Sequence, residues 1–412
     1  MTGSGDARSP IDGRVLASRF AAPETEAMRI VLINGPNLNL LGARSPEFYG
    51  RTTLRDLEES CRDVADARGA TLEAYQSNHE GDIIDRLHAS RDADAVIINP
   101  GAFTHYSYAI RDAIEGIGIP TVEVHISNIK DREPWRRVSV VSEVCVATIF
   151  GRGIDGYRDA IEHVVARAAW PLETISYGPG GHQVGDLRVP ESSGPHPVAV
   201  LLHGGFWRAT HGRDLLDAAA VDLARRGWAT WNIDFAGLGA GGGWRETSAD
   251  VVAAIESLGL FGAAHGLDLG RIVLVGHGSG GQLAMCASKQ AQTVAAAVGL
   301  APISDLEQAY EAGIGDGAVA EYVRSAPAAS PDRYEAVSPI RLLPLGVPLL
   351  IVHGDADDRI PAAMSRSFAG RAADEGDTVV YHELEDVGHR ELVDPDTSAW
   401  SQVAEELERL RS

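Results

Sequence analysis

The stretch RIVLINGPNLNLLGARSPEFYG, residues 29–50, sets the fold of the first part of the chain. It opens with a short apolar run that predicts a buried strand, and polar residues follow at the strand's carboxyl end. Similar runs recur at residues 95–98 and 121–124, and amphipathic stretches of helical period lie between them. Strands that alternate with helices predict a parallel sheet covered by helices on both faces.

The same alternation restarts beyond a stretch rich in Pro, Gly and Ser, so the 412 residues are expected to form more than one domain. The later apolar runs are VAVLLHGGFW, WATWNIDFAG, RIVLVGHGSGG and PLLIVHGDADD. We therefore predict a second domain that is also α/β and parallel. The expected segments are a disordered extension at 1–27, a first domain at 28–168, a linker with the first strands of the second domain at 169–196, and the second domain at 172–412.

Composition excludes several classes of protein. The 36 basic and 58 acidic residues give a net charge of −22, the wrong sign for binding nucleic acid. The only cysteines are Cys61, Cys145 and Cys286, an odd and widely spaced set that predicts buried thiols in a reducing compartment. Residues 1–27 lack the apolar core of a secretory signal, and no run is long enough to span a membrane. We expect a cytoplasmic protein.

Polar side chains cluster where the strands of the first domain are expected to end. Ligands of open parallel sheets bind beyond the carboxyl ends of the strands. The polar residues at these ends and in the loops after them include Asn37, Arg44, Tyr49, Asn99, His105, His125, Ser127 and Arg136. Amides, imidazoles, a phenol and guanidinium groups suit a small, anionic ligand that carries several hydroxyl groups.

Four motifs make this pattern specific: INGPNLNLLGARSPEFYG, YQSNHEGDIIDRLH, IINPGAFTHYSYAIRDA and VEVHISNIKDREPWRR. In order and spacing they resemble the motifs of type II 3-dehydroquinate dehydratases, over essentially all of residues 29–168. The resemblance implies a flavodoxin-like fold that converts 3-dehydroquinate to 3-dehydroshikimate without cofactor or metal, in trimers that group into a dodecamer. A flavin-binding module of the same architecture remains an alternative.

The resemblance also implies roles for individual residues. Tyr49 becomes the base that removes the proton next to the ketone, Arg44 stabilises charge on the tyrosine loop, and His125 protonates the departing hydroxyl. A guanidinium beside a phenol favours the phenolate, which makes these assignments chemically reasonable. Asn37 is expected to stabilise the developing enolate oxygen, and Glu123 to fix the tautomer of His125.

Further residues are implied to hold the substrate: Asn99, His105, Asp112, Arg136 and the main chain at Ile126 and Ser127. Asp112 would reach its site from a neighbouring subunit. Lys130, the only lysine of this domain, lies in a charged loop, so a Schiff-base mechanism is not favoured. Aromatic biosynthesis and quinate breakdown use the same elimination, and the sequence does not separate these two roles.

In the second domain, RIVLVGHGSGGQLAM has the strand, sharp turn and helix of a nucleophile elbow. With the HGGFW loop that contains Gly204 and Gly205, and with Asp357 and His389 in the expected order, it resembles the α/β-hydrolase superfamily, in particular esterases and arylformamidases. The resemblance implies an α/β-hydrolase fold in which Asp357 orients His389 as the base.

The elbow departs from its usual pattern at the central position. Glycines at 276 and 280 place Gly278 where the nucleophile belongs, whereas Ser279 becomes the nucleophile only if His277 takes a position that normally needs a small residue. Two interpretations stay open: a noncatalytic or impaired hydrolase domain, and an esterase or amidase that acts through Ser279. The sequence contains no HExxH motif and no Cys/His ligand spacing, so we expect no metal.

Overall fold

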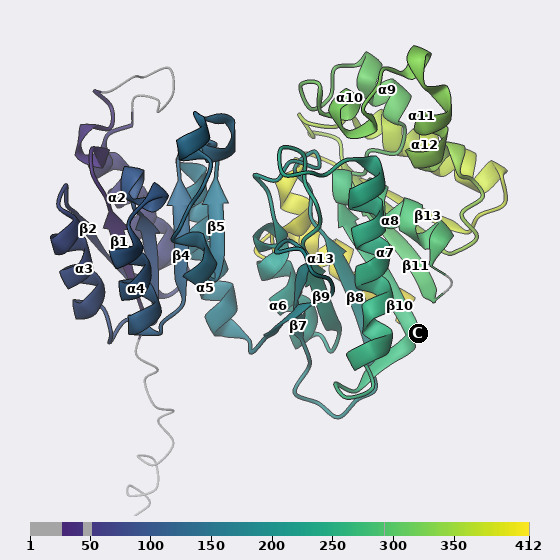
Figure 1. Cartoon of the computed structure of the whole chain (residues 1–412). Helices are drawn as coiled ribbons and strands as arrows, with labels where there is room; N and C mark the ends of the chain where they lie inside the picture. Colours follow the sequence, from purple (N-terminus) through teal and green to yellow (C-terminus); the bar gives the residue numbers. More distant parts are fainter. Residues whose placement is uncertain (1–26, 44–51, 292, 412) are drawn as a thin grey trace, which may run out of the picture.

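The computed structural model describes residues 27–43, 52–291 and 293–411. These residues form two α/β units, each built around its own sheet, with the first unit drawn in purple and blue in Figure 1 and the second in teal to yellow. Among the described residues, no helix is long and apolar enough to cross a membrane.

The first sheet has five parallel strands in the order β2-β1-β3-β4-β5. The strands are β1 (Met28–Asn34), β2 (Ala70–Gln76), β3 (Ala95–Asn99), β4 (Thr121–His125) and β5 (Ala147–Phe150). The helices are α2 (Leu54–Ala67), α3 (Glu80–Ala89), α4 (Tyr108–Ile117) and α5 (Asp155–Ala169). This arrangement confirms the predicted flavodoxin-like parallel sheet.

Strand β1 shows why this sheet is covered on both faces. Because successive side chains of a strand point to opposite faces, Ile30 and Leu32 pack in one apolar cluster with α2 and α5. Val31 and Ile33 pack in the other cluster, with α3 and α4. The uninterrupted apolar run is therefore explained by two cores, one on each side of the sheet.

The second sheet has eight strands in the order β13-β12-β11-β10-β8-β9-β7-β6. They are β6 (Glu173–Ser176), β7 (Val184–Arg188), β8 (His196–Leu202), β9 (Ala229–Ile233), β10 (Leu267–His277), β11 (Val294–Leu300), β12 (Leu349–Gly354) and β13 (Val379–Leu384). The helices are α6 (Asp217–Arg225), α7 (Trp244–Phe261), α8 (Ser279–Gln290), α9 (Leu306–Glu311), α10 (Ala318–Val323), α11 (Pro331–Val337), α12 (Ala362–Asp374) and α13 (Ser398–Leu410).

The prediction of a fully parallel second sheet is wrong at one edge. Strand β7 runs antiparallel to β9, and β6 runs antiparallel to β7. Only a short turn joins β6 to β7, and strands joined in this way form a hairpin because a parallel pair needs a long crossover. The other six strands are mutually parallel, as predicted.

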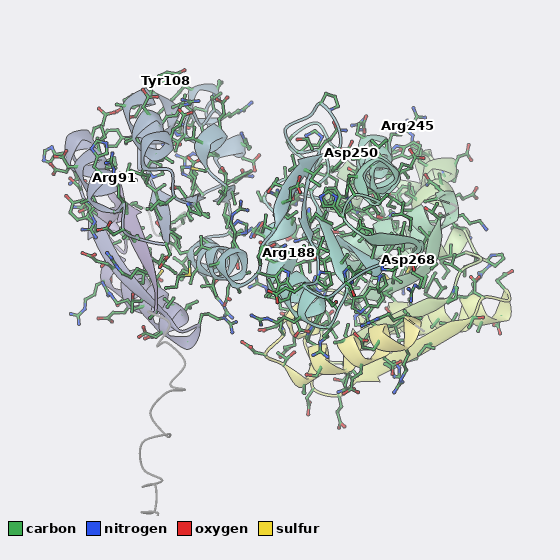
Figure 2. The ribbon with its side chains drawn as sticks, turned by 90° about the horizontal axis from the view of Figure 1, so that it is seen from below. Arg91, Tyr108, Arg188, Arg245, Asp250 and Asp268 are labelled. Atoms are coloured by element: carbon green, nitrogen blue, oxygen red, sulfur yellow. The ribbon has the colours of Figure 1, made fainter. Side chains whose placement is uncertain are left out.

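Buried charges join the two units. Arg152, just before α5, bonds through Nη1 to Asp214 of the second unit at 2.6 Å. His163 on α5 lies 2.5 Å from Asp217 on α6, through Nδ1 and Oδ2, and Arg188 bonds the same carboxylate at 2.9 Å. Figure 2 shows Arg188 on the side of the second unit that faces the first. Because all five side chains are largely buried, these contacts fix the two units against each other.

Candidate active sites

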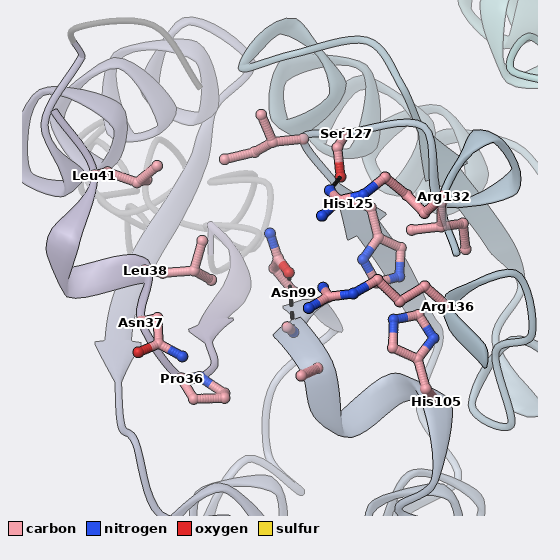
Figure 3. A pocket seen from close by; sticks show the side chains of 14 residues that line it. Pro36, Asn37, Leu38, Leu41, Asn99, His105, His125, Ser127, Arg132 and Arg136 are labelled. Atoms are coloured by element: carbon pink, nitrogen blue, oxygen red, sulfur yellow. Dashed lines mark hydrogen bonds between the residues drawn. The ribbon is translucent and has the colours of Figure 1, made fainter. Parts of the chain in front are cut away.

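A pocket lies at the carboxyl ends of β1, β3 and β4, the edge at which the sequence predicted a ligand (Figure 3). The register places Asn34 of β1 level with Asn99 of β3, so the polar strand ends meet at one height. The pocket is lined by Pro36, Asn37, Leu38, Leu41, Asn99, Gly101, Ala102, His105, His125, Ile126, Ser127, Ile129, Arg132 and Arg136.

Asn99 is held in place by a buried hydrogen-bond chain. Its Oδ1 accepts from the Gly101 N–H at 3.1 Å, and its Nδ2 donates to the Tyr157 hydroxyl at 2.7 Å. Tyr157 donates in turn to Asn34 at 3.0 Å. Burial raises the pKa of Tyr157, so this phenol stays protonated. The Asn99 amide has two N–H groups. One donates to Tyr157, and the same hydrogen bonds orient the second N–H so that it can donate to a ligand.

His125 is oriented by a buried carboxylate. Its Nε2 lies 2.8 Å from Oε1 of Glu123, and both side chains are almost fully buried. A carboxylate only accepts hydrogen bonds, so Nε2 carries a proton. The other ring nitrogen, Nδ1, is therefore the one left to exchange a proton with a ligand in the pocket (Figure 3).

Glu123 is kept ionised by its hydrogen bonds. Burial alone would raise its pKa, but bonds from His125, Thr104 and Ser139 outweigh burial and hold the pKa below its usual value. The Ser139 hydroxyl lies 2.9 Å from each carboxylate oxygen, and Thr104 donates to Oε1. A negative charge fixed beside His125 stabilises the imidazolium, the form that can act as an acid.

Cationic and neutral nitrogen groups line the same side of the pocket as His125 (Figure 3). Burial lowers the pKa of His105, whose Nδ1 bonds the Val138 carbonyl at 2.8 Å, so the imidazole is neutral and Nε2 is the nitrogen left for a ligand. Arg136 stacks on Trp135 with 4.3 Å between the guanidinium carbon and the ring centre. Arg132 also lines the pocket and donates to Ser127 at 3.3 Å. Two guanidinium groups make this side of the pocket suitable for a carboxylate.

Most of the predicted residues of the first site, but not all, meet in this pocket. Asn37 lines it from a left-handed turn, with φ 67°, that is fixed by a bond from its N–H to Asn78. Asp112 lies on the exposed side of α4, outside the pocket of a single chain. Arg44 and Tyr49 lie outside the described residues. Sequence reasoning missed Arg132, although its loop, NIKDRE, lies directly between two predicted motif residues.

The second site centres on the turn between β10 and α8. Gly278 has φ 56° and ψ −116°, the sharp conformation of a nucleophile elbow. A side chain at 276 would meet the Gly280 carbonyl at 2.1 Å, and one at 280 would meet the Leu202 carbonyl at 2.0 Å. Because both positions admit only glycine, the central position of the elbow is Gly278.

Ser279 points elsewhere. It is the first residue of α8 and is 2% exposed, and its hydroxyl accepts from the Trp207 N–H at 3.3 Å. A Cβ at Gly278, by contrast, would lie 3.2 Å from Nε2 of His389. The elbow therefore directs position 278, and not position 279, at the predicted base.

The predicted acid and base are in contact. Nδ1 of His389 lies 2.6 Å from Oδ2 of Asp357, and the N–H groups of Arg359 and Ile360 donate to Oδ1 at 2.8 and 2.9 Å. Burial would raise the pKa of Asp357, but hydrogen bonds from His353 and His389 hold it well below its usual value. The carboxylate is charged and orients His389 with Nε2 toward the elbow.

The HGG loop lies against the elbow. The Cα of Gly204 is 3.9 Å from the place of a Cβ at Gly278. Gly205 has φ 105°, and a side chain there would collide with His211 at 2.3 Å, so only glycine fits. The predicted loop and elbow thus form one site, which lacks only a side chain at its centre.

The remaining candidate groups show no other chemistry. Cys61 and Cys286 are buried and Cys145 is half-buried, and burial raises the pKa of Cys61 and of Cys286 to about 12, so these two thiols stay protonated. Within the described ranges, no cluster of three or more His, Cys, Asp or Glu side chains could hold a metal ion.

Residues 28–165 match the family model described as dehydroquinase class II. "Catabolic 3-dehydroquinase 1" of Aspergillus fumigatus is 59% identical over 136 residues, which are 33% of this chain and 91% of that protein. The same name belongs to a Neosartorya fischeri protein that is 58% identical over 136 residues, again 33% of this chain and 91% of that protein. These matches confirm the resemblance that the four motifs carried.

Residues 186–371 match the family model BD-FAE. The structure of esterase B from Lactobacillus rhamnosis is 17% identical, covers 61% of this chain and 90% of that chain, and has a TM-score of 0.53. A truncated carbohydrate esterase from gut microbiota is 18% identical, covers 58% and 95% of the two chains, and has a TM-score of 0.52. At these identities the likeness is one of fold, and it confirms the α/β-hydrolase fold.

Proposed function

The chain belongs to the class II dehydroquinase family, and we propose that its first domain, residues 28–168, eliminates water from 3-dehydroquinate to give 3-dehydroshikimate. The observation that carries the proposal is the pocket in which His125, fixed by Glu123, lies beside two arginines. His125 can act as the acid that protonates a leaving hydroxyl, and the two arginines can bind a carboxylate in the same pocket.

In the proposed mechanism, Tyr49 removes the proton next to the ketone while Arg44 favours its phenolate. Electrons move to the ketone oxygen, and Asn37, directly or through a water molecule, stabilises the enolate. The enolate then expels the hydroxyl group, which takes a proton from His125, so that water leaves. The support for His125 as the acid is its orientation: with Nε2 bonded to Glu123, Nδ1 is the nitrogen that can deliver the proton.

We propose that the substrate carboxylate and hydroxyls bind Asn99, His105, Arg136 and the main chain at Ile126 and Ser127. Arg132 is an addition to this set, supported by its place in the pocket lining. The neutral His105 suits a hydroxyl group, since its free nitrogen accepts a hydrogen bond.

Turnover of 3-dehydroquinate, followed by the absorbance of the conjugated enone product, tests this function directly. Borohydride with substrate separates the mechanism from a Schiff-base route, in which a lysine is trapped as an irreversible adduct. We expect full activity after borohydride, because Lys130 does not line the pocket and its Nζ bonds the Arg137 carbonyl at 3.0 Å. An adduct on Lys130 would contradict the mechanism, and a bound yellow chromophore would favour the flavin-binding alternative.

We propose a trimer, or a dodecamer of four trimers, in which Asp112 of one subunit completes the pocket of the next. Support comes from its position, because Asp112 is 76% exposed and its only partner in the described part of the chain is the neighbouring Arg111 at 3.5 Å. Mass measurement of the intact assembly tests the proposal. A monomer with full turnover would contradict it.

We also propose that the enzyme acts in the cytoplasm, in quinate breakdown. Support for the catabolic role is the shared name of the fungal relatives, catabolic 3-dehydroquinase. Induction of the protein by quinate as carbon source tests this, and constitutive expression with a requirement for aromatic amino acids on deletion would favour biosynthesis.

For the second domain we propose that Ser279 is not a nucleophile. The support is the contrast between the buried Ser279 hydroxyl, bonded to the Trp207 N–H, and position 278, which faces His389. The esterase or amidase that would act through Ser279 is the less favoured alternative. Fluorophosphonate labelling decides between them, since only an activated serine reacts.

A further inference from the structure

The elbow of the second domain presents a base to an empty side-chain position. A Cβ at Gly278 would lie 3.2 Å from Nε2 and 3.4 Å from Cε1 of His389. A hydroxyl on that carbon would stand within hydrogen-bond reach of Nε2. An oxygen atom from any other source could occupy the same place, because glycine leaves it unfilled.

His389 is prepared to act on such an oxygen. Its Nδ1 bonds the charged Asp357 at 2.6 Å, which leaves Nε2 as the acceptor, and its side chain is 15% exposed, so solvent reaches it. The side chain of Asp357 is fully buried and held by two main-chain N–H groups. A fixed carboxylate also stabilises the imidazolium that forms when Nε2 takes a proton.

Donors for a developing oxyanion are present beside this position. Ser279 is the first residue of α8, and the first N–H groups of a helix have no partner inside the helix. In a nucleophile elbow the N–H after the central residue pairs with one from the loop after the preceding strand, here the loop with Gly204 and Gly205. That loop approaches position 278 to within 3.9 Å.

We propose that this domain hydrolyses esters without a covalent acyl-enzyme, with a water molecule between Gly278 and His389 as the nucleophile. His389 Nε2 takes a proton from the water while the water oxygen bonds to the ester carbonyl carbon. The carbonyl electrons move to its oxygen, which the N–H donors stabilise. The bond to the alcohol oxygen then breaks, and the imidazolium returns the proton to that oxygen, which gives a carboxylic acid and an alcohol.

The surroundings select neutral esters. An open groove next to the site includes Phe206, which follows the HGG loop, and the main chain around Asp357. Its charged lining comprises Asp316, Asp355, Asp357, Asp358 and Glu383 against Arg359 and Arg366. Arg366 is already paired with Glu383 at 2.6 Å. An excess of negative charge repels an anionic ester, and this includes esters of quinate through its free carboxylate.

Hydrolysis of the neutral ester p-nitrophenyl acetate by the full chain tests the proposal. p-Nitrophenyl hemisuccinate, which carries a negative charge, serves as the anionic comparison substrate. We expect steady release of nitrophenolate without an initial burst, and a rate that falls by about 100-fold or more in His389→Ala, the usual contribution of a general base. The anionic ester should react more slowly, and added salt should narrow the difference. Near-ultraviolet circular dichroism shows whether His389→Ala has kept its tertiary structure.

Gly278→Ser supplies a second, independent test, because it restores a hydroxyl where the geometry expects one. Fluorophosphonate should label this variant at position 278, and p-nitrophenyl acetate should now give a burst. Three results overturn the proposal: a rate in the unaltered chain no higher than in His389→Ala, a fluorophosphonate label on Ser279, and a folded Gly278→Ser that takes no label.

Discussion

Each of the two sites of this chain contains a histidine that is oriented by a buried carboxylate. The sites differ in the groups that surround the histidine. In each, a buried carboxylate holds a histidine at the carboxyl end of a parallel sheet: Glu123 with His125 at 2.8 Å, and Asp357 with His389 at 2.6 Å. In the first site the histidine opens on a pocket with two arginines, whereas in the second it opens on a glycine. A histidine oriented by a carboxylate therefore does not by itself determine the reaction. The groups on the other side of the imidazole determine it.

The backbone of the second site has the shape of a nucleophile elbow, with glycine at its centre. Gly276 and Gly280 are required by contacts of about 2 Å that any side chain would make. At position 278 a Cβ would approach only the His389 ring closely, at 3.2 Å from Nε2, and the φ of 56° strains any side chain there.

Tyr49→Phe should have the largest effect on the first site and none on the second. Removal of the proposed base should lower turnover of 3-dehydroquinate by about 10²- to 10⁴-fold, the range that a general base contributes. Steady-state kinetics of the purified variant give the measurement, with hydrolysis of p-nitrophenyl acetate as the internal control. Turnover within a few-fold of normal would mean that another group is the base.

Arg152→Ala should show how much the buried contact between the two domains contributes to the free energy of unfolding. The buried guanidinium bonds Asp159 at 2.9 Å and Asp214 at 2.6 Å, and its loss leaves Asp214 buried without its cation. Such a loss costs about 3–5 kcal/mol of the free energy of unfolding. Urea unfolding measures it. The matched control is Arg390→Ala, which removes a largely exposed bond to the same Asp159 and should cost at most about 1 kcal/mol.

Glu123→Gln should show how much the negative charge beside His125 contributes to turnover, apart from the orientation of the imidazole. The amide keeps the shape of the side chain but removes the charge beside His125, and a hydrogen bond to a charged group is worth about 1.5–3 kcal/mol. We expect kcat to fall by about 10- to 100-fold with a small change in KM. Glu59→Gln, which alters an exposed carboxylate on α2, is the control. A change in KM alone would point to substrate binding instead.

Acid should destabilise the second domain before the first. Burial lowers the pKa of His211 to about 3 and that of His277 well below its usual value. Below pH 6.5 the unfolded chain binds protons that the folded chain does not, so stability falls as pH falls. His211 alone contributes about 2 kcal/mol between pH 6.5 and 5. In the first domain burial also lowers the pKa of His105, which gives a smaller loss of the same sign. The carboxylate of Glu123, with a lowered pKa, begins to lose its contribution only as pH falls below about 4.3.

Tryptophan fluorescence suits this measurement, because five of the seven tryptophans belong to the second domain: Trp207, Trp228, Trp231, Trp244 and Trp400. Dehydratase turnover reports on the first domain in the same samples. His211→Asn should reduce the loss of stability between pH 6.5 and 5. Equal loss in that variant would contradict the role of His211.

Local patterns were sufficient to predict two α/β domains. The resemblance of four motifs supplied the site residues, of which Asn37, Asn99, His105, His125, Ile126, Ser127 and Arg136 line one pocket. The apolar run of β1 and the glycine spacing around Gly278 act through neighbours in the sequence, so they could be read without tertiary information. The missed features depend on distant partners. Arg132 lies in a charged loop that looked like surface, and the bond of Arg152 to Asp214 needs the two domains in place. The antiparallel edge depends on the short connection between β6 and β7, which is too short for the crossover of a parallel pair.

The sharpest measurement combines both sites in one sample: intact mass after excess fluorophosphonate, followed by turnover of 3-dehydroquinate. We predict an unchanged mass and full turnover, because the elbow carries glycine at its centre and the dehydratase uses no activated serine. An adduct located at Ser279, or dehydratase activity lost on treatment, would contradict the division of chemistry between the two domains.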